Sequence, residues 1–219
     1  MTLTELLEKY GEKYLQGLLT TWQLTAISFV IVMVLSVAVT VMRVSPFKPL
    51  RAVGDFYVQV FRNIPGVALL VIVVYALPYL GLVLSYRTCV IVTTVLLGSA
   101  FGSENFMTGI NTVGVGQVEA ARSIGLSFGQ ILSKIVIPQA LRSAVLPMTN
   151  LCIAVLLTTA LGSQVPLNPT ELTGVVSYVN TRDVGGILAF LISALCYAGT
   201  AVVIGFVGNH IDKKVRVIR

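Results

Sequence analysis

Charged residues are scarce in this sequence, and their scarcity excludes an ordinary soluble protein. Asp, Glu, Lys and Arg make up 11% of the 219 residues, whereas a soluble domain carries about a quarter. Hydrophobic residues make up 56%, and the mean hydropathy is +0.90. A chain with so few charges cannot cover a water-facing surface, so the composition predicts several membrane-spanning helices.

Residues that hold metals or carry out catalysis are also few. The three cysteines, Cys89, Cys152 and Cys196, lie inside apolar runs without metal-ligand spacing, and we interpret them as small core residues. The single histidine, His210, follows the last apolar run, where an interfacial position is favoured over a proton relay. The apolar runs hold no cluster of nucleophile, base and orienting group. We therefore predict no catalytic, cofactor-binding or metal-binding residue, which argues against an enzyme.

Five apolar segments are long enough to cross a bilayer, since a spanning helix needs about 20 residues for roughly 30 Å of hydrocarbon. We place these spans at Leu18–Met42, Phe56–Leu77, Thr88–Ile110, Ser143–Leu161 and Gly186–Val207. Pro78 is expected to end the second span. Gly98 and Gly102 form a small-xxx-small pattern that lets a neighbouring helix approach closely. The predicted fold class is an all-α polytopic membrane helix bundle with five transmembrane helices.

The distribution of cations predicts how this bundle is oriented, because cytoplasmic loops collect Lys and Arg. One side gathers eleven of the fifteen cations: Arg43, Lys48, Arg51, Arg62, Arg122, Lys134, Arg142, Lys213, Lys214, Arg216 and Arg219. The other side holds Lys9, Lys13, Arg87 and Arg182. We therefore expect the N-terminus outside and the C-terminus in the cytoplasm. The cations lie in short clusters between apolar runs, so a nucleic acid partner is not expected.

Two short segments are expected to form helices on the outer side. Residues 1–16 have apolar residues at helical spacing, with Thr2 and Glu5 in capping-box register, which is typical of a helix lying on the membrane surface. Residues 17–219 would then form the transmembrane domain.

The second outer helix is expected at residues 168–180, between the last two spans. There Asn168 is interpreted as the N-cap, Pro169 as the first helical residue and Glu171 as the third. Such a helix is either a lid over a cavity or a simple connection.

Residues 116–142 lie between the third and fourth spans, on the predicted cytoplasmic side, and indicate two helices. The first is expected at Gln117–Ile124, with Gly125 in a left-handed stop. The second has Ser127 as N-cap and an apolar stripe that continues until Pro138 breaks the helix. These signals predict a folded segment rather than a slack linker.

This segment resembles the cytoplasmic coupling motif of the permeases of binding-protein-dependent ABC importers. The resemblance rests on Glu119-Ala120-Ala121, then Gly125 after three residues, Ile135 after nine more, and Ile137-Pro138, with Ile137 where leucine is usual. Matches on either side, which resemble the polar amino acid subfamily, are Gly116-Gln117, Gln139-Ala140-Leu141-Arg142, Leu146-Pro147, Thr149-Asn150, Thr20, Arg62 and Pro65. An amphipathic connector needs the caps and the stripe, but not Glu-Ala-Ala and Gly at that spacing.

The resemblance implies a type I importer permease in the bacterial cell membrane. Two permease subunits, identical or related, would form the pathway, an external binding protein would deliver the substrate, and each permease would insert its short helix into a separate ATP-binding subunit. ATP and Mg would be bound there, because this chain has no Gly-x-x-x-x-Gly-Lys-Ser/Thr loop. The coupling residues implied are Gln117, Glu119, Ala120, Ala121, Gly125, Ile135 and Pro138.

Four polar residues inside the spans are candidates for the substrate pathway: Glu104, Asn150, Thr158 and Thr159. An ionisable residue in a span invites a functional interpretation because its insertion is costly. For Glu104, a hydrogen bond that stabilises the bundle is an equal alternative, and Met107 stands where the family has an arginine. The Lys-Asp pair that the family carries before Thr159 is absent, so the partner permease is expected to hold more of the substrate site.

The substrate is inferred from resemblance alone. Asn105-Phe106-Met107, with Gly109 to Val113, resembles actinobacterial glutamate permeases, which implies glutamate or a related polar amino acid. Glutamine, aspartate and arginine remain alternatives. An ATP-independent channel or secondary carrier is the competing class, although such carriers often show internal repeats and coupling carboxylates near the midplane.

Overall fold

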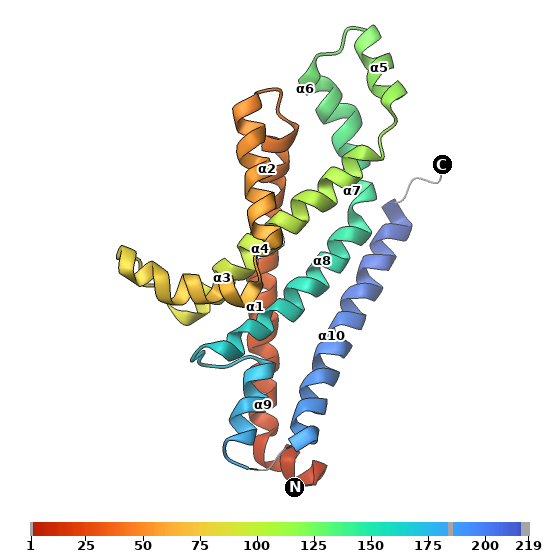
Figure 1. Cartoon of the computed structure of the whole chain (residues 1–219). Coiled ribbons are helices and arrows are strands. Elements are labelled where there is room, and N and C mark those ends of the chain that lie inside the picture. Colours follow the sequence, from red (N-terminus) through yellow and green to blue (C-terminus); the bar gives the residue numbers. More distant parts are fainter. Residues whose placement is uncertain (1, 184–185, 216–219) are drawn as a thin grey trace.

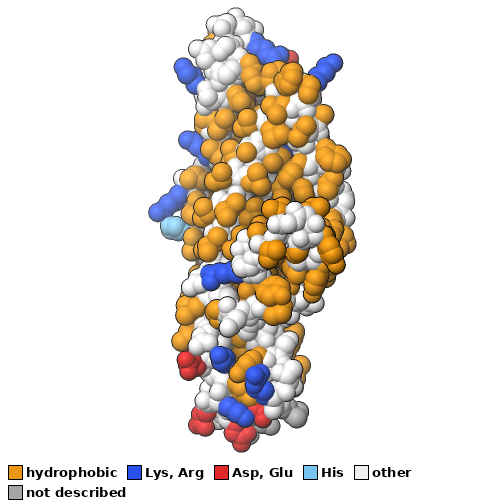
Figure 2. Space-filling model, turned by 90° about the vertical axis from the view of Figure 1, so that its left-hand side faces the viewer, with side chains coloured by type: hydrophobic (Ala, Val, Ile, Leu, Met, Phe, Trp, Pro, Cys, Tyr) orange, Lys and Arg blue, Asp and Glu red, His pale blue; other side chains and the backbone are white. Residues whose placement is uncertain are grey.

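The structure is a computed structural model that describes residues 2–183 and 186–215, and the regular structure in this part of the chain is entirely helical (Figure 1). Four helical segments are long and apolar enough to cross a membrane, and a bent pair makes a fifth when counted as one span. The all-α membrane bundle predicted from sequence is therefore confirmed. On the face shown in Figure 2, hydrophobic side chains cover the middle of the molecule, and most charged side chains lie toward its two ends.

Helix α1 (Leu3–Val44) is the longest element and packs against α2, α4 and α9. The predicted capping box is present, with Thr2 N donating to Glu5 Oε2 at 2.9 Å and Glu5 N donating to Thr2 Oγ1 at 3.3 Å. One continuous helix runs through residue 16, where the sequence placed the boundary between the outer helix and the transmembrane domain. The apolar stripe of Leu6, Tyr10 and Tyr14 is buried against α9 and α10, so its cover is protein rather than the membrane surface.

The second predicted span is not straight. It is divided into α2 (Lys48–Asn63) and a second arm, made of α3 (Gly66–Val71), the π-helical turn η1 (Ile72–Ala76) and the 3₁₀ turn η2 (Leu77–Leu80). The two parts meet at 105°. Pro65 explains the bend, since the residue before a proline is forced out of the helical region, and Ile64 has φ −88° and ψ 132°. Pro78 does not end this arm, which stops at Gly81 with φ +80°.

The remaining spans lie close to their predicted positions. The third is α4 (Tyr86–Asn111), and the fourth is α8 (Val145–Thr158) continued by the 3₁₀ segment η4 (Thr159–Gln164). The fifth, α10 (Gly186–Val215), extends well beyond the predicted Val207 and includes the exposed His210. The two predicted cations Arg216 and Arg219 lie outside the described residues.

A seam of small residues joins α1 and α4, as the Gly98 and Gly102 pattern predicts. A Cβ atom added at Gly98 would lie 2.7 Å from Val32 Cγ2, and one at Gly102 would lie 2.0 Å from Ser36 Oγ. Across the same seam, Ser36 donates a hydrogen bond to the Ser99 carbonyl at 3.3 Å. The absence of side chains at these two glycines therefore sets how closely the helices approach.

Helix α9 (Leu172–Asn180) begins later than predicted. The N-cap is Glu171 rather than Asn168, because the Glu171 carboxylate accepts from the backbone N–H groups of Thr173 at 2.6 Å and Gly174 at 2.8 Å. Leu172 is held by its backbone N–H, which donates to Thr21 Oγ1 of α1 at 3.2 Å. The helix is thus a packed part of the bundle, lying between α1 and α10.

Candidate coupling site and membrane pathway

The first coupling helix, α5 (Val115–Ser123), ends as predicted at Gly125. Gly125 has φ +82°, its N–H donates to the Arg122 carbonyl at 2.9 Å, and Leu126 N donates to the Ala121 carbonyl at 3.1 Å. These bonds satisfy carbonyls that would otherwise be orphaned at the end of the helix. The turn reverses the chain and places α5 beside α6, away from the rest of the bundle (Figure 1).

The second coupling helix starts at the predicted cap. Ser127 N donates to Gln130 Oε1 at 2.9 Å, and Gln130 N donates to Ser127 Oγ at 3.4 Å. The helix then runs through α6 (Phe128–Ile131), the π-helical turn η3 (Leu132–Val136) and α7 (Ile137–Ser143). The prediction that Pro138 breaks this helix is therefore wrong. Proline lacks an N–H and crowds the preceding turn, and the wider π turn immediately before α7 accommodates it.

A small hydrophobic core holds this coupling segment together. Val113, Ala121, Ile131 and Val136 are buried in it, with Leu126 and Ile135 packed against them. A further brace joins its two ends, because Gln139 Nε2 donates to Gln117 Oε1 at 2.7 Å. The segment is thus a folded unit, and the predicted residues Ala121 and Ile135 form its interior.

The other predicted coupling residues face outward. Glu119, Ala120, Gly125 and Pro138 are exposed. Large apolar side chains lie exposed around them, namely Val115 at 72%, Ile124 at 77% and Phe128 at 49%. Exposed apolar surface on a folded projection is typical of a protein-binding site.

Glu104 lies in a network of charges that joins three helices. Its Oε1 atom is 2.9 Å from Arg43 Nη2 of α1 and 3.2 Å from Arg62 Nη1 of α2. Arg43 also contacts Asp55 Oδ1 through Nε at 2.9 Å and donates to Ser103 Oγ at 3.1 Å. This geometry favours the bundle-stabilising interpretation of Glu104. The arginine missing at Met107 is replaced by arginines from other helices, which sequence reasoning did not pair with Glu104 because they are distant in the chain.

The three polar candidates on the fourth span do not share one face. Asn150 is exposed and Thr158 is half-buried, and between them lies Ala154, which is exposed and whose carbonyl accepts from Thr158 Oγ1 at 2.7 Å. Thr159 is fully buried and donates to the Leu156 carbonyl at 2.7 Å. Asn150 and Thr158 therefore fit an exposed path along α8, whereas Thr159 faces the protein interior.

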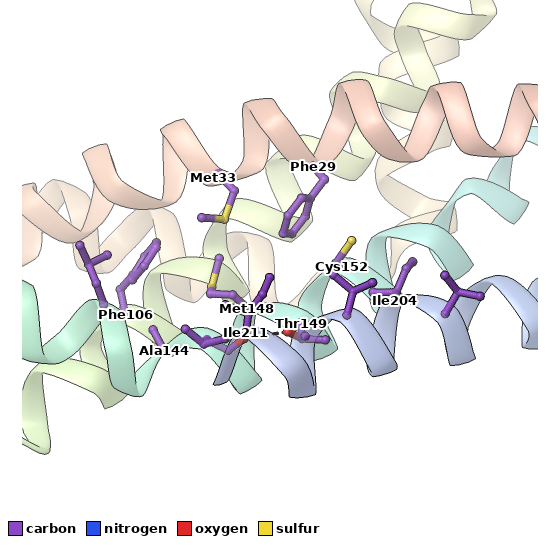
Figure 3. Close-up of a pocket in the computed structure, with 14 residues that line it drawn as sticks. Phe29, Met33, Phe106, Ala144, Met148, Thr149, Cys152, Ile204 and Ile211 are labelled. Carbon is purple, nitrogen blue, oxygen red and sulfur yellow. Dashed lines mark hydrogen bonds between the residues drawn. The ribbon is translucent and has the colours of Figure 1, made fainter. Parts of the chain in front are cut away.

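An apolar crevice of about 450 Å³ opens between α1, α8 and α10 (Figure 3). Phe29 and Met33 of α1 line it opposite Met148 and Cys152 of α8, with Ile204 of α10 at the side. The hydroxyl among its lining residues, that of Thr149, already donates to the Val145 carbonyl at 2.9 Å. The crevice therefore offers no free polar group to a charged amino acid, and it suits hydrocarbon.

Glu171 is a buried carboxylate that the sequence did not single out beyond its expected place in the helix. It has no exposed surface, caps α9, and accepts from Tyr197 Oη of α10 at 2.8 Å. Burial raises the pKa of Glu171, and the hydrogen bonds from Thr173, Tyr197 and Gly174 oppose that rise. Its side chain joins α9 to α10. The N-cap position before an apolar helix was the available signal.

Within residues 2–183 and 186–215, no three His, Cys, Asp or Glu side chains come together as metal ligands would.

Known proteins resemble this chain in both sequence and fold. Residues 33–217 match the family described as "Binding-protein-dependent transport system inner membrane component". The glutamate transport system permease protein GluC of Corynebacterium efficiens is 36% identical over 174 residues, which is 74% of this chain and 76% of the relative. The probable glutamine ABC transporter permease protein GlnM of Bacillus subtilis is 37% identical over 137 residues, which is 63% of each chain.

Solved structures share the fold over nearly the whole chain. A crystal structure of an amino acid ABC transporter with histidines has a TM-score of 0.91 at 23% identity and covers 98% of this chain and 99% of its own. An inward-facing structure of the MetNI methionine ABC transporter has a TM-score of 0.82 at 21% identity, covering 96% of this chain and 99% of its own. The helical bundle, the folded coupling segment and the family match over residues 33–217 lead to one conclusion: the chain belongs to the inner membrane component family of binding-protein-dependent transport systems, and it is an integral membrane transport subunit rather than an enzyme.

Proposed function

We propose that this chain is the permease subunit of an ATP-driven amino acid importer and carries glutamate or a closely related polar amino acid. The observation that carries the proposal is the coupling segment, which combines the family motif with an exposed apolar surface on a folded projection. The relatives named for glutamate and glutamine transport support the substrate class. Relatives of this kind also include an arginine permease, so glutamine, aspartate and arginine are the alternative substrates.

The outward residues of the coupling segment form the docking surface for a separate ATP-binding subunit. Glu119, Ala120 and Gly125 occupy it, with Val115 and Ile124 as the large apolar contacts. Movement of this surface reaches the membrane by two routes, because α5 follows α4 closely and α6 continues through η3 and α7 into α8. The Gln117 to Gln139 hydrogen bond joins the two routes, so the segment moves as one body.

The coupling segment lies in the cytoplasm in this proposal, and the N-terminal end of α1 lies outside. The support is the count of cations, eleven against four, with Lys and Arg enriched on the cytoplasmic side of membrane proteins. An external binding protein then meets the end of the molecule that carries α9, and a second permease subunit, identical or related, faces this chain across the pathway. Asn150 and Thr158 on the exposed face of α8 are the pathway residues we propose here.

The test is ATP-driven uptake of labelled glutamate into liposomes that contain this chain with its ATP-binding subunit and binding protein. Unlabelled glutamate, glutamine, aspartate and arginine are added as competitors. Glutamate should compete most strongly. If another of the four amino acids competes more strongly, the substrate assignment moves to that amino acid. If none of the four is taken up in an ATP-dependent manner, the importer function is rejected.

The coupling role is tested with Glu119→Trp, which adds bulk at the exposed docking surface, and with Ser133→Trp as a control on the exposed side of the second coupling helix. Glu119→Trp should reduce uptake at least tenfold, roughly the loss of one interface contact worth 1–2 kcal/mol, while ATP hydrolysis no longer responds to substrate. Full uptake by Glu119→Trp would contradict docking through this surface.

The competing function is an ATP-independent channel or carrier. Copurification discriminates the two, because an importer permease brings a stoichiometric ATP-binding subunit with it. Uptake by this chain alone in liposomes, without ATP, would favour the channel or carrier.

A further inference from the structure

A cavity of about 440 Å³, lined by both apolar and polar side chains, lies at the end of the molecule that carries the N-terminus of α1 and α9. Its walls include Lys13 and Gln16 of α1, the connection from Ser163 to Thr170, and one side of α9 as far as Arg182. Small-molecule sites have volumes of roughly 300 to 1,000 Å³. The cavity is therefore large enough for an amino acid or for the tip of a partner's side chain.

Two cations of this cavity gather on one aromatic ring. The Arg182 guanidinium carbon is 3.7 Å from the centre of the Tyr178 ring, and Lys13 Nζ is 5.6 Å from it. Stacking on an aromatic face orients a guanidinium while leaving its N–H groups free to bind. Lys13 Nζ also donates to Gln16 Oε1 at 3.3 Å, a neutral partner.

The nearby carboxylates are engaged elsewhere. Asp183 binds Lys9 Nζ at 2.5 Å and accepts from Tyr10 Oη. Glu171 is buried and caps α9, so the N–H groups of Thr173 and Gly174 already have a carboxylate partner and do not attract a second anion. Glu12, the residue before Lys13 in α1, accepts from Gln16 Nε2 at 3.2 Å. Among the described residues, no carboxylate lies within ion-pair distance of Lys13 or Arg182.

We propose that this cavity is a carboxylate-binding site, with Arg182 and Lys13 as the charged groups and the polar side chains of Asn168, Thr170 and Ser177 on its walls. The inference deepens the proposed function and rests on it for the source of the carboxylate. That source is a free acidic amino acid released at the outer end of the bundle or an acidic side chain of the external binding protein. Both would be held by charge-assisted hydrogen bonds from the guanidinium.

The experiment uses the full-length chain, purified with the subunits that accompany it and placed in lipid nanodiscs. Equilibrium dialysis with labelled glutamate and labelled succinate measures the free ligand, since succinate carries two carboxylates and no amine. The variants are Arg182→Gln and Lys13→Gln. Arg87→Gln is the matched control, because Arg87 is also predicted on the outer side and contacts Gln23 of α1 instead of this cavity.

For a free ligand, both probes should bind the unmodified protein, and Arg182→Gln should weaken binding roughly tenfold, the loss expected for one charge-assisted hydrogen bond. For a protein-borne carboxylate, the binding of neither probe depends on Arg182 or Lys13, and the affinity of the binding protein falls by a similar factor in Arg182→Gln and not in Arg87→Gln. If neither probe binding nor binding-protein affinity depends on Arg182 or Lys13, the site does not exist. ATP-driven uptake is measured in parallel, and its absence in the unmodified protein would reject the proposed function independently.

Discussion

At the scale of single residues, Gly125 shows how one backbone angle orients the coupling helix. Its φ of +82° lies in the left-handed region, and an added Cβ would meet no atom within 4 Å. Glycine is therefore required at position 125 because of the left-handed backbone conformation, and not because a side chain would clash with a neighbour. Gly129, four residues later, also has open space around it but has an ordinary helical conformation.

Gly125→Ala should therefore destabilise the coupling turn by about 1 kcal/mol and reduce ATP-driven uptake, because a left-handed alanine is strained. Gly129→Ala should be neutral or slightly stabilising, since alanine is the better helix former. Thermal unfolding and uptake of both variants test this. Equal effects of the two substitutions would contradict the role given to the backbone angle.

Glu171 gives a second residue-scale prediction. Because burial raises its pKa above the ordinary value of 4.5, the folded state binds a proton more readily than the unfolded state. Its contribution to stability is therefore fully present below the unfolded pKa and declines as the pH rises through the folded pKa. Glu171→Gln should flatten this part of the pH profile of the unfolding temperature, while Glu171→Ala should lose about 1–3 kcal/mol from uncapped N–H groups. An unchanged profile in Glu171→Gln would contradict the assignment.

At the scale of elements, sequence reasoning succeeded where signals are local and failed where they are not. The caps at Thr2 and Ser127 depend on residues three positions apart, so both were found. The bend before α3 was missed although Arg62 and Asn63 interrupt the apolar run and Pro65-Gly66 is a turn signal, because the span was placed by its length and average hydropathy. The partners of Glu104 come from α1 and α2, and no spacing in one sequence pairs residues that the fold alone brings together.

The contact between α1 and α4 provides an element-scale prediction. Gly102→Ala places a Cβ 2.0 Å from Ser36 Oγ, so the two helices must separate. We expect a loss of about 1–3 kcal/mol, as for overpacking in a core, and partial rescue by Ser36→Gly. Gly205→Ala in α10, where no atom lies within 4 Å of an added Cβ, is the control. Unfolding temperatures in detergent are measured for Gly102→Ala, for Gly102→Ala combined with Ser36→Gly, and for Gly205→Ala. An unchanged unfolding temperature in Gly102→Ala would show that the α1–α4 contact is loosely packed.

At the scale of the whole molecule, the charge network at Glu104 ties α1, α2 and α4 together near the end that carries the coupling segment. The Arg43 side chain in this network is 12% exposed, so its contacts are only weakly screened by solvent. The helices are therefore linked by ion pairs at one end of the bundle and, near the other end, by the hydrogen bonds of buried Glu171 between α9 and α10.

Orientation in the membrane is the whole-molecule prediction. In a chain whose three native cysteines are replaced by alanine, Glu8→Cys should react with a membrane-impermeant maleimide in intact cells. Ser133→Cys, on the exposed side of the second coupling helix and outside the proposed docking surface, should react only after the cells are opened. Both positions are exposed, so burial does not limit labelling. The reverse pattern would overturn the orientation derived from the cations.

The division of the coupling segment into an interior and an outer surface has a consequence for how such subunits diversify. Ala121 and Ile135 pack in the interior of the coupling segment and set the orientation of α5. Glu119, Ala120, Val115 and Ile124 lie on its outer surface and contribute little to the interior. Under the docking that we propose, preference for one ATP-binding subunit over another can change through substitutions on the outer side while the interior keeps the fold. A chimaera that exchanges only those outer positions should bind a different ATP-binding subunit and keep its substrate.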